Sequence, residues 1–293
     1  MKQVAVLGLG QMGTTLAQLL LRAGMEVQVW NRTAGRSTAL ADAGAIVAGN
    51  PAAAVRAAQV IVICVHDHAA VRDILDADGV ATALAGKVLV QLTTTSPQEA
   101  RAIAETVAAL HAGHLAGAIQ VAPEQMGQPD TTILVSGPAA DHDRVRDVLA
   151  ALGGNIVYLG EQADAAATMD LATLSYIYGA AAGFFQGAAL AERAGMDVRT
   201  YGDIAQAMAP SFAAFLRHEA EAIATDDYAI TQSPLSISVD ATRRIEEAVR
   251  AAGLNAEVPA LVAKLLRNAA QAGYAREEFA AVVKVLREPA HAA

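Results

Sequence analysis

Short runs of β-branched and other apolar residues alternate with Ala- and Leu-rich segments from residue 3 to about residue 160. Such alternation is typical of βαβ units, in which helices connect parallel strands. The runs predict strands at Gln3–Leu9, Glu26–Trp30, Val60–Val65, Val88–Leu92, His114–Val121, Thr132–Ser136 and Asn155–Tyr158. The segments between them predict helices that begin near Met12, Ala34, Pro51, Ala69, Pro97 and Ala139. The first part of the chain is therefore expected to form an α/β domain with a parallel sheet.

After Gly160 the strand patterns stop and helical periodicity continues to the end of the chain. One long helix is predicted at Gln162–Ala194, where Gly195 ends it. Shorter helices are predicted at Thr200–Met208, Ser211–Ala224, Ser238–Ala252 and Pro259–Ala272. We expect two domains, residues 1–160 and residues 161–293, with the second all-α.

The long helix is apolar on nearly every face between Leu171 and Ala191. Asp170 and Glu192 flank this stretch, and it lacks the basic flank that favours a membrane span. Such a helix must be covered on nearly every face. The remaining helices of one chain are too few for this, so we expect a homodimer in which the long helix packs against the partner's helices. Coverage within one subunit is the alternative.

The composition narrows the class of partner. The formal net charge is −9 and the sequence pI is near 5.2, which argues against nucleic-acid binding and favours a small-molecule ligand. The only cysteine, Cys64, lies in the apolar run at residues 60–65, and we expect it to be a buried strand residue without a redox role. The N-terminal apolar run is too short for a secretion signal or a membrane span, so a cytoplasmic location is expected.

A glycine-rich turn follows the first predicted strand and opens the first predicted helix. Its sequence is Gly8-Leu9-Gly10-Gln11-Met12-Gly13, which matches the G-x-G-x-x-G pattern of dinucleotide sites in its proper context. Gly8 allows the tight turn, Gly10 lets the backbone approach a pyrophosphate, and Gly13 permits the helix to pack closely on the strand. The helix N-terminus adds N–H donors and a positive dipole end. We expect all six residues to contact a dinucleotide.

The end of the second predicted strand indicates which dinucleotide. An NAD-selective site places Asp or Glu there, to bind the ribose 2′-hydroxyl. Here the strand is followed by Asn31, Arg32 and Thr33, with Arg36 close behind. Guanidinium groups bind a 2′-phosphate in charge-assisted pairs, so these four residues favour NADPH/NADP⁺. The alternative is that both arginines are merely solvated.

Two further loops follow predicted strands and should lie at the same edge of the sheet. Val65 and His66 are expected along the cofactor, as is Thr94, whereas Thr95 is expected in the substrate pocket. His66 and His68 are too weak a pattern to indicate a metal, and none is expected.

The candidate catalytic residues lie on the predicted long helix. Asp170 and Tyr178 are eight positions apart and share a helix face, about 12 Å apart along the axis. An isolated acid in so apolar a helix is costly unless it is solvated, paired or in a cleft. We expect the two to be catalytic. The alternatives are a helix-start charge or intersubunit salt bridge for Asp170 and a core position for Tyr178.

Several of these motifs together resemble the imine reductases and reductive aminases, which are relatives of the β-hydroxyacid dehydrogenases. The shared segments are Gly8–Gly13, Trp30–Thr33, Leu92–Pro97, Asp170–Ala172 and Gly183–Leu190, and the resemblance runs over nearly the whole chain. It implies a Rossmann-type NADP-binding domain, a long interdomain helix and a helical domain exchanged across a homodimer (domain-swapped), with the active site between subunits.

The resemblance also implies the reaction. The β-hydroxyacid dehydrogenases carry a catalytic lysine where this chain has Asp170, whereas reductive aminases pair an acid with a tyrosine eight positions later, as Asp170 and Tyr178 match. The expected activity is therefore NADPH-dependent reduction of the C=N bond of imines or iminium ions to amines. The reductive aminases often have Asn where this chain has Thr94, and an aromatic residue near Phe212. Because the match to these enzymes is incomplete, a ready-made imine is favoured as substrate over coupling of a carbonyl compound with an amine.

Weaker candidates for the pocket wall are Met126, Tyr176, Met208, Phe212 and Phe215, for which core packing is the alternative. Two other functions stay open. One is a β-hydroxyacid-type dehydrogenase with a different proton donor, although residues 121–126 lack the Gly- and Ser-rich loop of acid-binding relatives. The other is a non-catalytic NADPH-sensing dimer.

Overall fold

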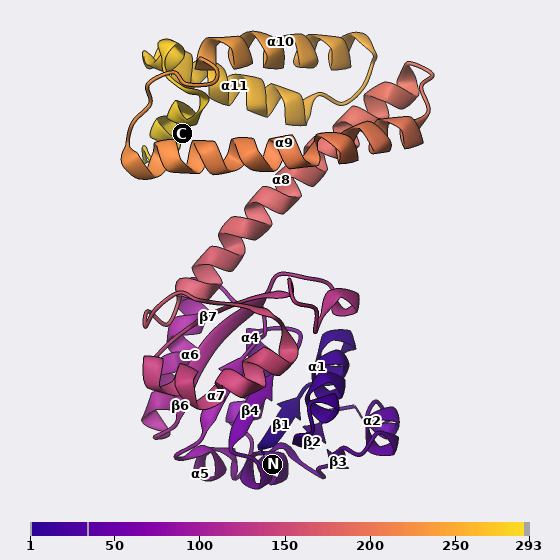
Figure 1. Ribbon diagram of the computed structural model, residues 1–293, viewed down its shortest axis with the longest axis vertical. Coiled ribbons are helices and arrows are strands. Elements are labelled where there is room, and N and C mark those ends of the chain that lie inside the picture. Colours follow the sequence, from indigo (N-terminus) through magenta and orange to yellow (C-terminus); the bar gives the residue numbers. More distant parts are fainter. Residues whose placement is uncertain (1, 34, 290–293) are drawn as a thin grey trace. The chain divides into compact units, whose positions relative to one another are not determined.

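A computed structural model of the protein describes residues 2–33 and 35–289. The chain forms two compact units that divide at Ser175 and Tyr176 (Figure 1). The first unit contains the sheet, and the second is helical. This confirms the expected α/β architecture with a helical C-terminal part, whereas the expected boundary at residue 160 stays a prediction. The helix start expected at Ala34 lies outside the described residues.

The sheet has eight strands in the order β3-β2-β1-β4-β5-β6-β7-β8. The strands are β1 (Gln3–Leu7), β2 (Glu26–Trp30), β3 (Ile46–Val47), β4 (Val60–Ile63), β5 (Val88–Gln91), β6 (Gly113–Ile119), β7 (Thr132–Ser136) and β8 (Asn155–Tyr158). All neighbours are parallel except β6 and β7. The expectation of a wholly parallel sheet was therefore wrong at this pair. Its connection holds only the 3-10 turn Pro123–Gln125, and a parallel pair needs a longer crossover that is usually a helix.

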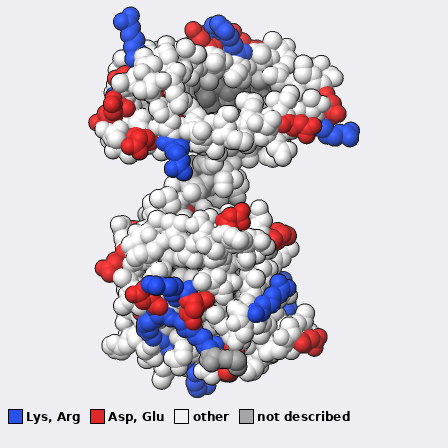
Figure 2. Space-filling view, in the orientation of Figure 1, with Lys and Arg blue, Asp and Glu red and all other residues white. Residues whose placement is uncertain are grey.

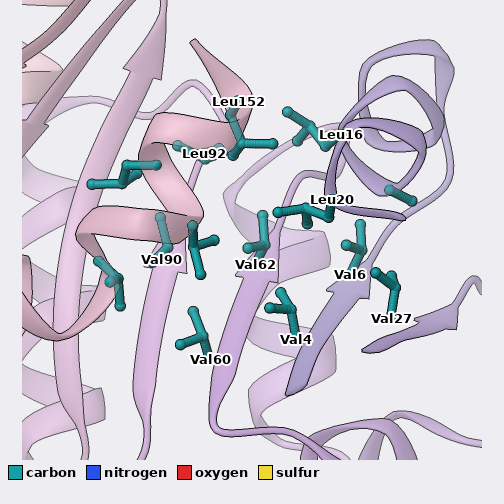
Figure 3. Packing of buried hydrophobic residues seen from close by; sticks show 14 of the residues in the cluster. Val4, Val6, Leu16, Leu20, Val27, Val60, Val62, Val90, Leu92 and Leu152 are labelled. Carbon is teal, nitrogen blue, oxygen red and sulfur yellow. The ribbon is translucent and has the colours of Figure 1, made fainter. Parts of the chain in front are cut away.

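Helices cover both faces of the sheet because successive strand residues point to opposite sides. The helices of this unit are α1 (Gln11–Arg22), α2 (Thr38–Asp42), α3 (Pro51–Ala57), α4 (His68–Leu75), α5 (Val80–Leu84), α6 (Pro97–Ala109) and α7 (Ala139–Leu152). Val4 and Val6 of β1 pack with Leu16 and Leu20 of α1, together with residues of α7 (Figure 3). Leu7 faces the other side, among residues of α3–α6. The core is thus built from both faces of the strands that carry the glycine turn.

Four strands end earlier than the apolar pattern predicts, namely β1, β4, β5 and β6. β1 ends at Leu7 and β4 at Ile63, so Gly8 and Cys64 belong to loops. Cys64 is half-buried after the strand rather than buried within it, which corrects that expectation. The sequence pattern also missed β3 and α5, because two and five residues are too few to show a period.

The C-terminal part begins with the long helix α8 (Ala165–Arg193). It continues with α9 (Val198–Thr225), α10 (Leu235–Ala251), α11 (Glu257–Gln271), the 3-10 turns Tyr274–Arg276 and Phe279–Ala281, and α12 (Val282–Leu286). The prediction of separate helices at 200–208 and 211–224 was wrong, because α9 runs through Pro210. The Ala-rich turns on both sides continue the helix across the one hydrogen bond that proline removes. Among the described residues, no helix combines the length and apolar character needed to cross a membrane.

Candidate active site

The strand order places one cleft at the point where the sheet reverses direction. β1 lies between β2 and β4, so the loops that follow these three strands leave the same edge in diverging directions. Ligands of open α/β sheets bind at such a point. A cleft of about 790 Å³ lies there, lined by Gly8–Gly13, Trp30–Thr33 and Cys64–His66, with Arg36 and Pro123 among its other residues.

The three glycines of the turn have different surroundings. Gly8 has φ +101°, and a Cβ there would lie 2.2 Å from the carbonyl oxygen of Cys64. A Cβ on Gly13 would lie 2.0 Å from the carbonyl oxygen of Gly8. A Cβ on Gly10, in contrast, meets nothing within 4 Å and would project into open space. Protein packing thus explains two glycines, whereas the third leaves room for a ligand's phosphates at the N-terminus of α1, which fits a dinucleotide.

The loop after β2 brings polar side chains to the same cleft. Asn31 accepts the N–H of Leu9 at 3.0 Å through Oδ1 and donates to the carbonyl oxygen of Thr33 at 3.0 Å through Nδ2. It therefore joins the glycine turn to its own loop. Arg32 and Arg36 are exposed, line the cleft, and form no salt bridge within residues 2–33 and 35–289. Their guanidinium groups are available to an anion, which fits a 2′-phosphate.

The loops after β4 and β5 are held together by a threonine that the sequence analysis did not single out. Val65 and the exposed His66 line the cleft, and the N–H of Val65 donates to Oγ1 of the buried Thr93 at 3.0 Å. Thr94 is exposed and Thr95 is buried, and neither lines the cleft. Their predicted contacts stay predictions. The signal for Thr93 was its place as the first of three threonines after a buried strand.

Cys64 also lines the cleft, yet it is poorly suited to thiolate chemistry. Burial raises the pKa of its thiol to about 11. The thiolate is the reactive form of cysteine, so at neutral pH this side chain stays a neutral thiol.

Asp170 is the most buried ionisable group on α8, with 4% of its surface exposed. Its Oδ1 accepts a hydrogen bond from Nε2 of Gln120 at 2.7 Å. Burial raises the pKa of the Asp170 carboxyl above its ordinary value, and the Gln120 hydrogen bond opposes part of that rise. Asp170 lies beyond the first turn of α8 and has no ion-pair partner within the described part of the chain, so a helix-start charge does not describe it, whereas the intersubunit salt bridge stays an open alternative. A buried acid of raised pKa is poised to exchange a proton.

The remaining candidates lie in different surroundings. Met126 is buried in the core beside α1, so packing accounts for it. Tyr178 on α8 is 70% exposed in the single chain, and Tyr176 and Met208 are exposed as well. Phe212 and Phe215 stack on each other along α9, with ring centroids 6.0 Å apart. Tyr178 is therefore not a core tyrosine of the single chain.

A second group of ionisable side chains lies in the helical unit and was missed by the sequence analysis. Ligand atoms of His218, Glu219 and Glu278 come within 4.8 Å of one another. Burial opposes ionisation of Glu278, but the backbone N–H groups of residues 231–233 donate to its oxygens and hold its pKa at about 2. Because those oxygens are already engaged, Glu278 is better explained as the anchor of this loop than as a metal ligand.

Comparisons with known proteins cover both parts of the chain. Residues 3–160 match the family model for the NAD binding domain of 6-phosphogluconate dehydrogenase, and residues 162–288 match that for the C-terminal domain of NADPH-dependent reductive aminase-like proteins. An NADPH-dependent reductive aminase from Aspergillus oryzae is 30% identical over 98% of this chain and 97% of its own length.

Solved structures agree with this result over the same extent. An imine reductase from Myxococcus stipitatus in complex with NADP⁺ is 28% identical with a TM-score of 0.92, covering 98% of this chain and all of that one. A reductive aminase from Aspergillus terreus in complex with NADPH and ethyl levulinate is 32% identical with a TM-score of 0.90, covering 98% of this chain and 99% of that one.

Proposed function

This chain belongs to the family of NADPH-dependent reductive aminases and imine reductases, and from that premise we propose that it reduces the C=N bond of imines or iminium ions to amines. The enzyme is an NADPH-dependent oxidoreductase. The observation that carries the proposal is Asp170, a buried carboxyl of raised pKa that stands on α8 with Tyr178 eight positions later.

The cofactor is NADP(H), held by the cleft at the carboxyl ends of β1, β2 and β4. Gly10 leaves room for the pyrophosphate, and Arg32 and Arg36 provide the positive charge for the 2′-phosphate. Val65, His66 and Thr94 complete the contacts that we propose along the cofactor. When bound, NADPH supplies the hydride.

The two catalytic groups divide the remaining work. A carboxylate at Asp170 stabilises the positive charge of an iminium ion, and its raised pKa makes it easier to protonate than an ordinary aspartate. The Tyr178 hydroxyl donates a hydrogen bond or a proton to the substrate nitrogen. Of the pocket candidates, we retain Thr95, Tyr176, Met208, Phe212 and Phe215 as residues that face substrate.

The partners are a small-molecule imine, or a carbonyl compound with an amine, and a second copy of this chain. We propose a domain-swapped homodimer because α8 buries only Ala166, Ala167 and Asp170 in the single chain, while Phe185 stays 67% exposed. Figure 2 shows that much of the surface on one face of the helical part carries neither Lys and Arg nor Asp and Glu. Large exposed apolar surface marks a protein interface. A cytoplasmic location stays part of this proposal.

The experiment that tests the proposal follows NADPH oxidation with 1-pyrroline and a dihydroisoquinoline, and separately with a 2-keto acid and a semialdehyde acid. Oxidation with the imines supports the proposal. Oxidation only with the acids would establish the β-hydroxyacid-type dehydrogenase instead. Tight NADPH binding with no oxidation by any compound would favour the NADPH-sensing dimer.

A further inference from the structure

We infer that Gln120 is a positioning residue that fixes the orientation of the Asp170 carboxyl and favours its charged form. The inference rests on the proposed function for the meaning of Asp170 in the reaction. It concerns a different residue, however, and it is carried by contacts that all lie within the first unit of the chain.

Gln120 is placed by the sheet rather than by a flexible loop. It follows β6 directly, and its N–H donates to the carbonyl oxygen of Thr132 at 3.0 Å, which continues the pairing of β6 with β7 beyond Ile119. The sheet therefore fixes the backbone of Gln120 independently of its side-chain contacts. A side chain on such a base can hold a partner in one orientation.

The amide of Gln120 is held at both ends. Its Nε2 donates to Asp170 Oδ1 at 2.7 Å, and its Oε1 accepts from Oγ1 of Thr173 at 2.6 Å. Thr173 Oγ1 also lies 2.8 Å from the carbonyl oxygen of Asp170, as is usual for a hydroxyl one helical turn on. Because the Thr173 hydroxyl donates to the amide oxygen of Gln120, the NH₂ group of the same amide faces the Asp170 carboxylate. The second oxygen, Oδ2, has no hydrogen-bond partner within the described residues and is left for substrate.

The same three side chains can also accept a protonated Asp170. If the amide turns over, Gln120 accepts the carboxyl O–H and donates to Thr173 Oγ1, whose single hydroxyl proton then turns to the Asp170 carbonyl oxygen. Each of the three side chains therefore has a hydrogen-bond partner in either state. A methionine or leucine at position 120 would support neither arrangement, and it would leave the carboxyl without its donor.

The charge balance around Asp170 gives the direction of the effect. Burial raises the pKa of Asp170, and the Gln120 hydrogen bond lowers it; within the part of the chain that the structure describes, no charged side chain contributes. A hydrogen bond to a carboxylate is stronger than one to a neutral carboxyl. Removal of the donor should therefore raise the pKa of Asp170 further, and the charged form should be lost at a higher pH.

The test compares Gln120→Met, which keeps the length of the side chain and removes the donor, with Gln98→Met, the same change at an exposed position of α6. The pH dependence of kcat/KM for imine reduction should shift its acid limb to higher pH in Gln120→Met. At the acid end kcat/KM should fall about tenfold, with little change at the alkaline end. Gln98→Met should match the wild type. Thr173→Val should shift the limb in the same direction by less, and Thr173→Ser should restore the wild-type profile.

A second measurement does not depend on activity. The Asp170 carboxyl signal of protein labelled with ¹³C at the aspartate side chains is identified by its absence in Asp170→Asn and followed by NMR against pH. A higher titration midpoint in Gln120→Met supports the inference even if the wild type reduces no imine, which would defeat only the proposed function. An unchanged midpoint in folded Gln120→Met and Thr173→Val protein would overturn the inference even if imines are reduced.

Discussion

The two ends of helix α8 differ in how much of their surface the rest of the chain covers. Near its start, Ala166 and Ala167 are buried, the N–H of Ala166 donates to Ser136 Oγ at 3.0 Å, and Asp170 is bonded to Gln120. Further along the same helix, Tyr178 and Phe185 are 70% and 67% exposed. The first end is therefore covered and hydrogen-bonded by residues of the same chain. The second keeps apolar side chains exposed in the single chain, and the proposed homodimer would cover them.

The largest expected effect distinguishes the two proposed catalytic groups, Asp170 and Tyr178. Asp170→Asn removes the charge and the proton exchange and should lower kcat about a thousandfold, whereas Tyr178→Phe should lower it about thirtyfold. Stopped-flow measurement of NADPH oxidation with an imine checks both. Met169→Leu, an exposed neighbour on α8, serves as the control and should leave kcat unchanged. Wild-type rates in Tyr178→Phe would show that the exposed end takes no part in the chemistry.

Two substitutions in the glycine turn test the first unit of the chain. Gly13→Ala should destabilise the protein by about 3 kcal/mol because its Cβ has no room against Gly8. Gly10→Ala should leave the free energy of unfolding within about 0.5 kcal/mol of wild type but weaken NADPH binding at least about tenfold. Urea unfolding and a fluorescence titration with NADPH measure the pair. Full NADPH affinity in Gly10→Ala would mean that the phosphates do not lie against this turn.

The exposed half of α8 is tested by its largest apolar side chain. Phe185→Glu should raise the dissociation constant of the homodimer at least about a hundredfold, because each of the two buried phenyl rings contributes about 3 kcal/mol. Analytical ultracentrifugation over a range of concentrations reports this constant. Gln162→Glu adds the same charge ahead of the helix and should leave it unchanged. A wild type that stays monomeric at every concentration would contradict the proposed assembly.

The smallest expected effect concerns the choice of cofactor. Arg32→Glu should weaken NADPH binding about tenfold and leave NADH binding nearly unchanged, because it removes a charge-assisted contact to the 2′-phosphate only. Arg22→Glu, exposed at the end of α1, is the matched control. Equal loss of both cofactors would show that Arg32 acts on the turn and not on the phosphate.

The sequence predicts the features that depend on local patterns and misses those that depend on contacts between residues far apart in the chain. The glycine turn, Asn31 and the alternation of strands and helices follow from local patterns, since each depends on residues near in sequence or on the repeat of βαβ units. Gln120 escaped because its role depends on a contact with Asp170, fifty positions away in the sequence, and Thr173 escaped because its role depends on its contact with Gln120. A polar residue at the end of the predicted strand His114–Val121 and a threonine one turn after Asp170 were the available signals. The antiparallel pairing of β7 also escaped, since the apolar pattern of a strand carries no direction.

The proposed function is tested most directly by the fate of a labelled hydride. NADPH carrying deuterium at the transferred position of C4 is incubated with the protein and 1-pyrroline, and the product is analysed by mass spectrometry. Imine reduction by this protein predicts pyrrolidine with one deuterium at the former C=N carbon. An imine recovered unchanged, while a semialdehyde acid under the same conditions is converted to a deuterated hydroxy acid, would contradict it.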